Sequence, residues 1–329
     1  MSQESFTVFA GKMLHQDSKW IPEILRAMIT DRQADLLVAL PGTAAELAHK
    51  LGREPAEVEA DLRDLFRKGL AFKKEKAGVT TWRAPAHLAQ FHDASILWPE
   101  ATPAFYGLWK TYMDEEWPKL AGVLAKFLPR PYTRVVPVEK SLTGRPQVLT
   151  SDNVRSMLEA GRRFAVANCT CRLTMKKCDG PLDVCLQVNR AADYTIERGS
   201  GREITKAEAH KVVETAAAAG LVHVTMNKAE LEHFICNCCG CCCQSFSQLI
   251  EAGVPLCDPS RWRAEVEADA CTGCATCEDT CIFSAIAVND AGVAEVKADK
   301  CMGCGQCATT CPEEAIKMNE TREPGFIPA

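Results

Sequence analysis

Two stretches of the sequence that lie thirty residues apart carry the same spacing of cysteines. Residues 271–281 and residues 301–311 both read C-x2-C-x2-C-x3-C, and an Ala-Ile pair follows each run at the same offset. Thiolates at this spacing hold [4Fe-4S] clusters, because the C-x2-C steps let a tight loop wrap a cluster and present three sulfur ligands to it. Zinc has no need of a duplicated four-cysteine run. The repeat therefore predicts iron–sulfur binding in this part of the chain.

The duplicated run closely resembles the bacterial-type ferredoxins, which bind two [4Fe-4S] clusters. The resemblance implies that the fourth cysteine of each run binds the cluster of the other run. It assigns one cluster to Cys271, Cys274, Cys277 and Cys311, and the second cluster to Cys301, Cys304, Cys307 and Cys281. Pro312 follows the last cysteine as this family's pattern expects, whereas Ile282 replaces the proline expected after Cys281. This departure affects the stiffness of the loop and removes no ligand.

Eleven further cysteines precede the repeat. They are Cys169, Cys171, Cys178 and Cys185, then Cys236, Cys238, Cys239, Cys241, Cys242 and Cys243, and finally Cys257. All nineteen cysteines fall between residues 169 and 311, whereas disulfide-rich domains spread theirs through the chain, so the clustering favours metal ligation. Six unligated thiols within residues 236–243 would be an oxidation hazard in a cytosolic protein. We expect at least one additional iron–sulfur cluster, with the first two groups as its ligand pool.

The sequence leaves the pairing of these ligands open, and structural free cysteines or a disulfide relay are the alternatives. The surrounding residues include Cys169-x-Cys171-Arg172, Cys178, Cys185, Gly201-Arg202-Glu203-Ile204, Gly220-Leu221-Val222-His223, Asn227 and the 236–243 run. Together they resemble a group of ferredoxin-like proteins from anaerobes, and this resemblance implies redox work. Cys-Cys-Gly at 238–240 is similar to the motif of heterodisulfide-reductase-type clusters, but that family carries two copies and this chain carries one. An alanine-rich helix expected over 207–219 lies between the two cysteine groups and can bring them together by folding back.

In the N-terminal region, helices are expected over 31–40, 43–51 and 55–69, and a hairpin over 70–82. This order of elements resembles the winged-helix family. Thr43 can cap the second helix, and Pro55 suits the first turn of the third. The resemblance implies DNA binding through the third helix. The N-terminal part of this helix is acidic, whereas a DNA-reading helix should neutralise phosphates, so we expect protein docking or a structural role and regard DNA as an improbable partner.

Between these regions, the pattern predicts a helical connection over 104–128 with a break at Pro118. A strand is expected over 135–138, a helix over 152–160 capped by Ser151, and a strand over 164–166. The expected fold class is therefore α+β. It combines a winged-helix-like domain over 1–100, a connecting helix with a cysteine-rich α/β iron–sulfur domain over 101–264, and a two-[4Fe-4S] ferredoxin domain with a tail over 265–329.

Charge and hydropathy restrict the function further. The formal net charge of −5 argues against a strongly basic nucleic-acid-binding protein. Residues 265–319 carry 3 basic and 10 acidic residues, a balance that can steer this part towards a basic partner. The N-terminus shows no secretory signal, and the most apolar stretch, 216–226, is too short to cross a bilayer. We expect a cytoplasmic protein without membrane insertion.

These observations predict an iron–sulfur electron-transfer protein. It would pass single electrons between partner oxidoreductases through two [4Fe-4S] clusters and at least one further cluster, as a carrier or an electron-transfer subunit rather than as an enzyme. The sequence leaves two alternatives open: a redox-sensing or iron–sulfur-sensing winged-helix regulator, and a reductase with an unusual catalytic cluster in the middle domain. The sequence contains no G-x-G-x-x-G, G-x4-G-K-[ST] or H-E-x-x-H motif, so nucleotide, flavin and protease functions lack support.

Overall fold

The computed structural model describes residues 2–230 and 233–329, and these residues form two compact units of mixed α and β structure. The first unit consists of Met1–Pro118, Leu173–Met175 and Ile196–Gly201. The second consists of Lys119–Arg172, Lys176–Thr195 and Arg202–Ala329. Every cysteine of the chain belongs to the second unit.

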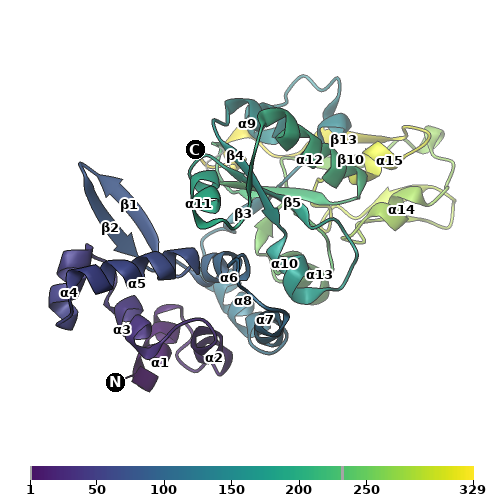
Figure 1. Ribbon diagram of the computed structural model, residues 1–329. Helices are drawn as coiled ribbons and strands as arrows, with labels where there is room; N and C mark the ends of the chain where they lie inside the picture. Colours follow the sequence, from purple (N-terminus) through teal and green to yellow (C-terminus); the bar gives the residue numbers. More distant parts are fainter. Residues whose placement is uncertain (1, 231–232) are drawn as a thin grey trace. The chain divides into compact units, whose positions relative to one another are not determined.

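The first unit is mainly helical and contains one β-hairpin among its described residues (Figure 1). Its helices are α1 (Ser2–Lys12), α2 (Trp20–Arg26), α3 (Asp31–Ala39), α4 (Ala44–Leu51), α5 (Pro55–Arg67), α6 (Leu88–Ile96) and α7 (Pro103–Glu115). The hairpin pairs β1 (Phe72–Lys76) with β2 (Val79–Arg83) in antiparallel fashion. The three helices and the hairpin expected between residues 31 and 82 are therefore present, within one to two residues of the expected bounds.

Local sequence signals explain where these helices begin. The side chains of Thr30 before α3 and Thr43 before α4 each accept a hydrogen bond from the backbone N–H three residues later. In turn, the side chains of Gln33 and Glu46 accept hydrogen bonds from the backbone N–H groups of these two threonines. Pro55 lies in the first turn of α5, where its missing N–H costs nothing. The apolar side of α5 is buried through Val58, Leu62, Leu65 and Phe66.

The break in the aromatic helical segment lies at Glu116 and not at Pro118. Helix α7 ends at Glu115, and α8 (Trp117–Phe127) contains Pro118 in its first turn. The carboxylate of Glu116 accepts hydrogen bonds from the Ser18 hydroxyl at 2.5 Å and from the backbone N–H of Lys19 at 2.9 Å. These bonds fix the junction, and the proline follows it where a helix tolerates one.

Two short segments from later in the chain complete the first unit. The buried His92 on α6 contacts the hydroxyl of Thr174 through Nε2 at 3.1 Å. The guanidinium of Arg198 lies 4.3 Å from the ring centroid of Phe72, and Lys73 on β1 pairs with Glu197 at 2.5 Å. The base of the hairpin is therefore covered by residues 196–201.

The described part of the second unit is built on a seven-stranded sheet. Its strands are β3 (Thr133–Val136), β4 (Phe164–Asn168), β5 (Asp183–Val188), β6 (Arg202–Ile204), β7 (Val222–Met226), β8 (Phe234–Cys238) and β9 (Cys257–Asp258). They lie in the order β6-β4-β5-β8-β7-β3-β9, and every pairing is antiparallel except that of β3 with β9. The ends of β4 and β8 carry cysteines from distant parts of the sequence, and only β5 separates these two strands.

The two faces of this sheet bury different cores. Val136, Leu186 and Ile235 pack in one core with α9 (Val154–Ala160) and α12 (Lys206–Ala218). The neighbouring Val135 lies in another core, in which Phe246 on α13 (Phe246–Ala252) also packs. This alternation follows from the strand geometry, in which successive side chains point to opposite faces. We call these sides the helix-covered face and the cysteine-bearing face.

The helix predicted over 152–160 begins later than expected. Its first residue is Val154, and the cap is Asn153 instead of Ser151, since the Asn153 side chain accepts from the backbone N–H of Ser156 at 3.1 Å. Residues 150–152 form a 3-10 turn. In this turn the buried Asp152 pairs with the fully buried Arg261, which keeps it out of the helix.

The remaining elements surround this sheet or form the C-terminal part. They are α10 (Thr170–Met175), α11 (Arg190–Arg198), β10 (Trp262–Val266), α14 (Thr276–Thr280), β11 (Ile286–Val288), β12 (Ala294–Val296), α15 (Gln306–Thr310) and β13 (Ile316–Glu320), with 3-10 turns at Glu139–Leu142, Ala268–Ala270 and Pro324–Phe326. Strand β10 pairs antiparallel with β13, and β11 with β12. None of the helices in residues 2–230 and 233–329 has the length and apolarity needed to cross a bilayer.

Candidate metal centres

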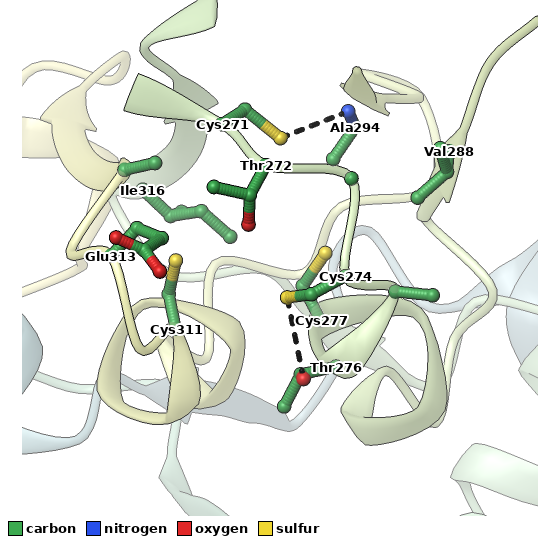
Figure 2. Close-up of a pocket in the computed structure, with 13 residues that line it drawn as sticks. Cys271, Thr272, Cys274, Thr276, Cys277, Val288, Ala294, Cys311, Glu313 and Ile316 are labelled. Atoms are coloured by element: carbon green, nitrogen blue, oxygen red, sulfur yellow. Dashed lines mark hydrogen bonds between the residues drawn. The ribbon is translucent and has the colours of Figure 1, made fainter. Parts of the chain in front are cut away.

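A pocket in the C-terminal part of the second unit is surrounded by four cysteines. Figure 2 shows Cys271, Cys274, Cys277 and Cys311 around this space, which measures about 340 Å³ including its opening to solvent. Cys274 is exposed, Cys277 is buried, and the other two are half-buried. The structure thus brings together, around one space, the four cysteines that the sequence resemblance assigns to one cluster.

Polar groups beside this pocket favour negatively charged sulfur. The backbone N–H of Ala294 donates to Cys271 Sγ at 3.4 Å, and the Thr276 hydroxyl lies 3.4 Å from Cys274 Sγ (Figure 2). The hydrogen bond with Thr276 holds the pKa of Cys274 below its ordinary value. Sulfur-only ligands around an open space, with N–H groups directed at them, are the donor set that a [4Fe-4S] cluster requires.

The four cysteines of the second ferredoxin-type set, Cys281, Cys301, Cys304 and Cys307, are all half-buried. Cys304 and Cys307 interact electrostatically with each other and with Cys281 and Cys301. Burial raises the pKa of Cys304 to about 12 and also raises that of Cys307, because a buried thiolate loses its hydration. The backbone N–H of Ala285 donates to Cys281 Sγ at 3.3 Å. Without positive charge from a metal, the thiols of Cys304 and Cys307 would stay protonated.

The two halves of the repeat share one backbone conformation. Helices α14 and α15 are offset by the same thirty residues as the cysteine runs, and the Thr280 and Thr310 hydroxyls on them lie 3.3 Å apart. Positive φ angles recur at the same offset, with 69° and 67° at Gly273 and Gly303. The same offset relates the next pair, Ala275 at 61° and Gly305 at 77°. The repeat in the sequence is therefore a repeat in the fold.

Close backbone packing explains the glycine at position 303. A Cβ built there would collide with the carbonyl oxygen of Trp262 on β10 and with the Ser260 hydroxyl. The positive φ adds strain for any other residue. Glycine is thus required where the cysteine loop passes β10.

Four cysteines from the middle of the chain form a compact group, which we call the sulfur tetrad. They are Cys178, Cys239, Cys241 and Cys242, and their four sulfur atoms all lie within 4.8 Å of one another. Cys178 Sγ is 3.8 Å from Cys239 Sγ and 3.9 Å from Cys242 Sγ. The tetrad joins the loop after α10 to the loop after β8.

Five other cysteines form a second group, which we call the five-sulfur chain. Its members are Cys169, Cys171, Cys243, Cys238 and Cys236, in the order in which hydrogen bonds connect them. The bonds that Cys243 receives from Cys171 and Cys238, supported by the backbone N–H groups of Phe246 and Ser245, hold its pKa well below the ordinary value. Two C-x-C pairs, one after β4 and one on β8, therefore converge on the sulfur of Cys243.

Neighbouring cysteines of the tetrad and the five-sulfur chain pack in different cores. Cys238 and Cys243 pack in the core of the cysteine-bearing face, whereas Cys239 packs with Val184, Ala216 and Leu221 near α12. Adjacent residues at the end of β8 thus contribute to different groups because side chains alternate along a strand. The dense run at 236–243 is divided between two sites.

A buried cation stands between these groups. Arg172 on α10 is 2% exposed, and its Nη1 donates to the backbone oxygen of Asn237 at 3.1 Å. Burial lowers its pKa, but the neighbouring thiolates of Cys169 and Cys239 outweigh this effect, so the pKa is raised overall. A guanidinium beside so many sulfur atoms offsets the negative charge that metal-bound thiolates carry. The C-x-C-Arg pattern was visible in the sequence, but nothing in it indicated that the arginine is buried.

The structure places two cysteines outside both groups. Cys185 on β5 accepts a hydrogen bond from Gln187 Nε2 at 3.1 Å. Cys257 on β9 is buried, and burial raises its pKa. Cys185 belongs to the ligand pool expected from the sequence, and its role as a metal ligand stays a prediction.

Comparison with known protein families identifies one matching segment. Residues 294–317 match Fer4, the 4Fe-4S binding domain, and this segment contains the second cysteine run of the repeat. No curated protein and no solved structure gives a significant match to the chain. The protein thus combines a mixed α and β fold with a 4Fe-4S binding domain near its C-terminus, and this domain indicates iron–sulfur binding. It also carries a separate group of four cysteines whose sulfur atoms lie close enough together to hold a metal ion.

Proposed function

We propose that this protein transfers single electrons between partner proteins through several iron–sulfur clusters. When bound, the clusters supply reversible one-electron chemistry: one electron enters from a reduced donor protein and one leaves to an oxidised acceptor protein, and no atoms are transferred. The protein is then an electron carrier, or an electron-transfer subunit, of the cytoplasm.

Two of the clusters are [4Fe-4S] clusters in a ferredoxin fold of the bacterial two-cluster type. The pocket bounded by Cys271, Cys274, Cys277 and Cys311 supports the first ligand set. The mutual electrostatic interactions of Cys281, Cys301, Cys304 and Cys307 support the second. The repeated backbone conformation supports two equivalent sites.

The five-sulfur chain holds the further cluster. It offers five thiols, of which Cys238 and Cys243 are only 8% exposed, so it can supply four ligands in a dry environment. Its two C-x-C pairs come from both cysteine groups of the middle region, which explains why the sequence carries both.

One observation supports the transfer of electrons between the five-sulfur chain and the second ferredoxin site. Cys238 and Cys243 of the five-sulfur chain share a core with Cys281, Cys301 and Cys304 of the second ferredoxin set. In this core Phe246 on α13 packs edge-on against Phe283, with ring centroids 5.0 Å apart. Ile282 packs there as well, and a Cβ built at Gly240 would come within 3.3 Å of Ile282 Cβ. The isoleucine that replaces the expected proline therefore packs where these parts meet.

The electrons would leave the protein at the first ferredoxin site, which is the more open of the two ferredoxin sites. Cys274 is exposed there, and all ten carboxylates of residues 265–319 are exposed as well. This charge suits docking of a redox partner with a basic surface. The N-terminal region, α3 to α5 with the hairpin, would be a winged-helix-like module for protein contacts and not for DNA.

A redox titration of the full-length protein, followed by EPR under anaerobic conditions, tests the proposal. We expect reversible one-electron signals from at least three clusters, and rapid reoxidation by a small one-electron acceptor. Clusters that cannot be reduced, or that are destroyed by a single cycle of reduction and oxidation, would rule out electron transfer as the function.

A further inference from the structure

We propose that the sulfur tetrad, Cys178, Cys239, Cys241 and Cys242, is a tetrahedral site for a single zinc ion. The site is separate from the iron–sulfur clusters and goes beyond the proposed electron transfer. Its role is structural, because four cysteine ligands complete a tetrahedral zinc site and leave no position open for a substrate.

The spacing of the sulfur atoms carries this inference. The Sγ–Sγ distances are 3.8 Å from Cys178 to Cys239, 3.9 Å from Cys178 to Cys242 and 3.8 Å from Cys241 to Cys242. Four thiolates arranged tetrahedrally at a Zn–S distance of about 2.3 Å are separated from one another by about 3.8 Å. The tetrad therefore has the dimensions of one ion with four sulfur ligands.

The same spacing is too small for an iron–sulfur cube. Each thiolate of a [4Fe-4S] cluster binds a different iron and points away from the cube, so its four sulfur ligands stand farther apart than they would on one ion. Within the described residues, only the tetrad brings three or more cysteine, histidine or carboxylate ligand atoms within 4.8 Å of one another. The ferredoxin cysteines form no group as compact as this among the described residues.

The surroundings suit a charged metal–thiolate centre. Four thiolates and one Zn²⁺ carry a net charge of about −2, and Arg172 interacts with the tetrad through Cys239. The backbone N–H of Lys177 donates to Cys242 Sγ at 3.4 Å. Lys176, which ends α10 in a left-handed conformation at φ 50°, turns the chain towards Cys178. Donors of this kind orient thiolate ligands and offset their charge.

The site would act as a staple between two loops. Cys178 lies 61 residues before Cys239, and within the described residues the tetrad links the loop after α10 to the loop after β8. A metal that closes so long a loop stabilises the folded state because the unfolded chain loses conformational freedom. Holding Cys239 and Cys242 also fixes their neighbours Cys238 and Cys243, which belong to the five-sulfur chain.

Metal analysis of the full-length protein, purified without oxygen and without added zinc, tests this assignment. We expect about one zinc per chain in addition to iron. The double variant Cys239→Ser/Cys242→Ser should lose this zinc and unfold at a lower temperature, while most iron and acid-labile sulfide remain. Cys257→Ala, which removes a buried thiol outside the tetrad, should keep the zinc.

X-ray absorption at the zinc edge of the unaltered protein provides a reading that does not depend on the variants folding. It should show four sulfur neighbours at about 2.3 Å. Oxygen or nitrogen neighbours would overturn the proposal, as would the absence of zinc. If the double variant loses iron and sulfide together, the tetrad holds an iron–sulfur cluster instead; if it loses iron alone, the site holds a single iron. Each of these results leaves the electron-transfer proposal standing, since that depends on the other cysteines.

Discussion

The guanidinium of Arg172 donates a hydrogen bond from Nη1 to the backbone oxygen of Asn237, at 3.1 Å. Asn237 separates the two cysteines of the C-x-C pair on β8, so the buried charge of Arg172 lies directly beside Cys236 and Cys238, which we propose as cluster ligands. A cluster becomes more negative when it is reduced, and a nearby cation stabilises that state.

We therefore predict that Arg172→Met makes the reduction potential of the cluster proposed in the five-sulfur chain more negative. Arg172→Lys, which keeps the positive charge but has fewer donors, should restore part of the difference. An EPR-monitored redox titration of the three proteins measures the potentials, and the ferredoxin signals of the same samples serve as an internal reference. An unchanged or more positive potential in Arg172→Met would show that this arginine does not tune the cluster.

The glycine at position 303 provides a prediction about stability. Strain at a positive φ alone costs about 1 to 3 kcal/mol. Gly303→Ala should lower the free energy of unfolding by more than this, because the added Cβ also collides with Trp262. Gly292→Ala is the matched control, since Gly292 also has a positive φ, 75°, but a Cβ added there would meet no atom within 4 Å. The two variants are compared by thermal unfolding in the absence of oxygen and by their iron content. Equal effects would mean that the packing against β10 is unimportant.

The acidic C-terminal part predicts a salt dependence of partner binding. The rate of electron transfer to a basic one-electron acceptor protein should fall steeply as ionic strength rises, because the Debye length shrinks to about 8 Å near 0.15 M salt. Stopped-flow kinetics over a salt series measure this. Charge reversal of the exposed Glu278 and Asp279 should flatten the dependence, and Glu4, an exposed acid of the first unit, is the control position. A rate that rises with salt would contradict steering by this surface.

The N-terminal unit should not bind DNA tightly. Arg53, at the start of the helix that would read DNA, pairs with the buried Asp61 at 2.5 Å, and Lys73 on the hairpin pairs with Glu197. Arg53→Ala should therefore lower the free energy of unfolding, by about 1 to 3 kcal/mol. Arg63→Ala breaks only an exposed pair with Glu59 and should cost less than about 1 kcal/mol.

Fluorescence anisotropy with labelled duplexes tests the DNA prediction near physiological salt. Submicromolar binding that disappears in Arg53→Ala or Lys73→Ala, with the fold intact, would favour the regulator instead of the electron carrier.

Local signals in the sequence predicted much of the fold. The cap at Thr43, the proline at 55 and the apolar spacing of the third helix place α4 and α5 correctly, because these signals act within a few residues. The helix α12 is likewise found where the alanine-rich segment lies. The return of residues 173–175 and 196–201 to the first unit was not predicted, since it depends on contacts such as His92 with Thr174.

The arrangement of the middle cysteines could not be predicted from their spacing. Cys171 meets Cys243 only because β4 and β8 lie on either side of β5, and strand order is a property of the whole sheet. The separation of Cys238 from Cys239 follows from the alternation of side chains along β8, but the strand itself had not been predicted. The boundary drawn at residue 265 also divides β10, whose buried Trp262 pairs with Glu320 on β13.

We propose that cysteines outside the ferredoxin repeat hold an iron–sulfur cluster of their own. The most direct measurement is the iron and acid-labile sulfide content of the full-length protein, purified without oxygen and normalised to amino-acid analysis. Two [4Fe-4S] clusters account for about eight irons, and a further cluster raises the total to about ten to twelve, with equal sulfide. A fully loaded protein with eight irons or fewer would contradict the claim.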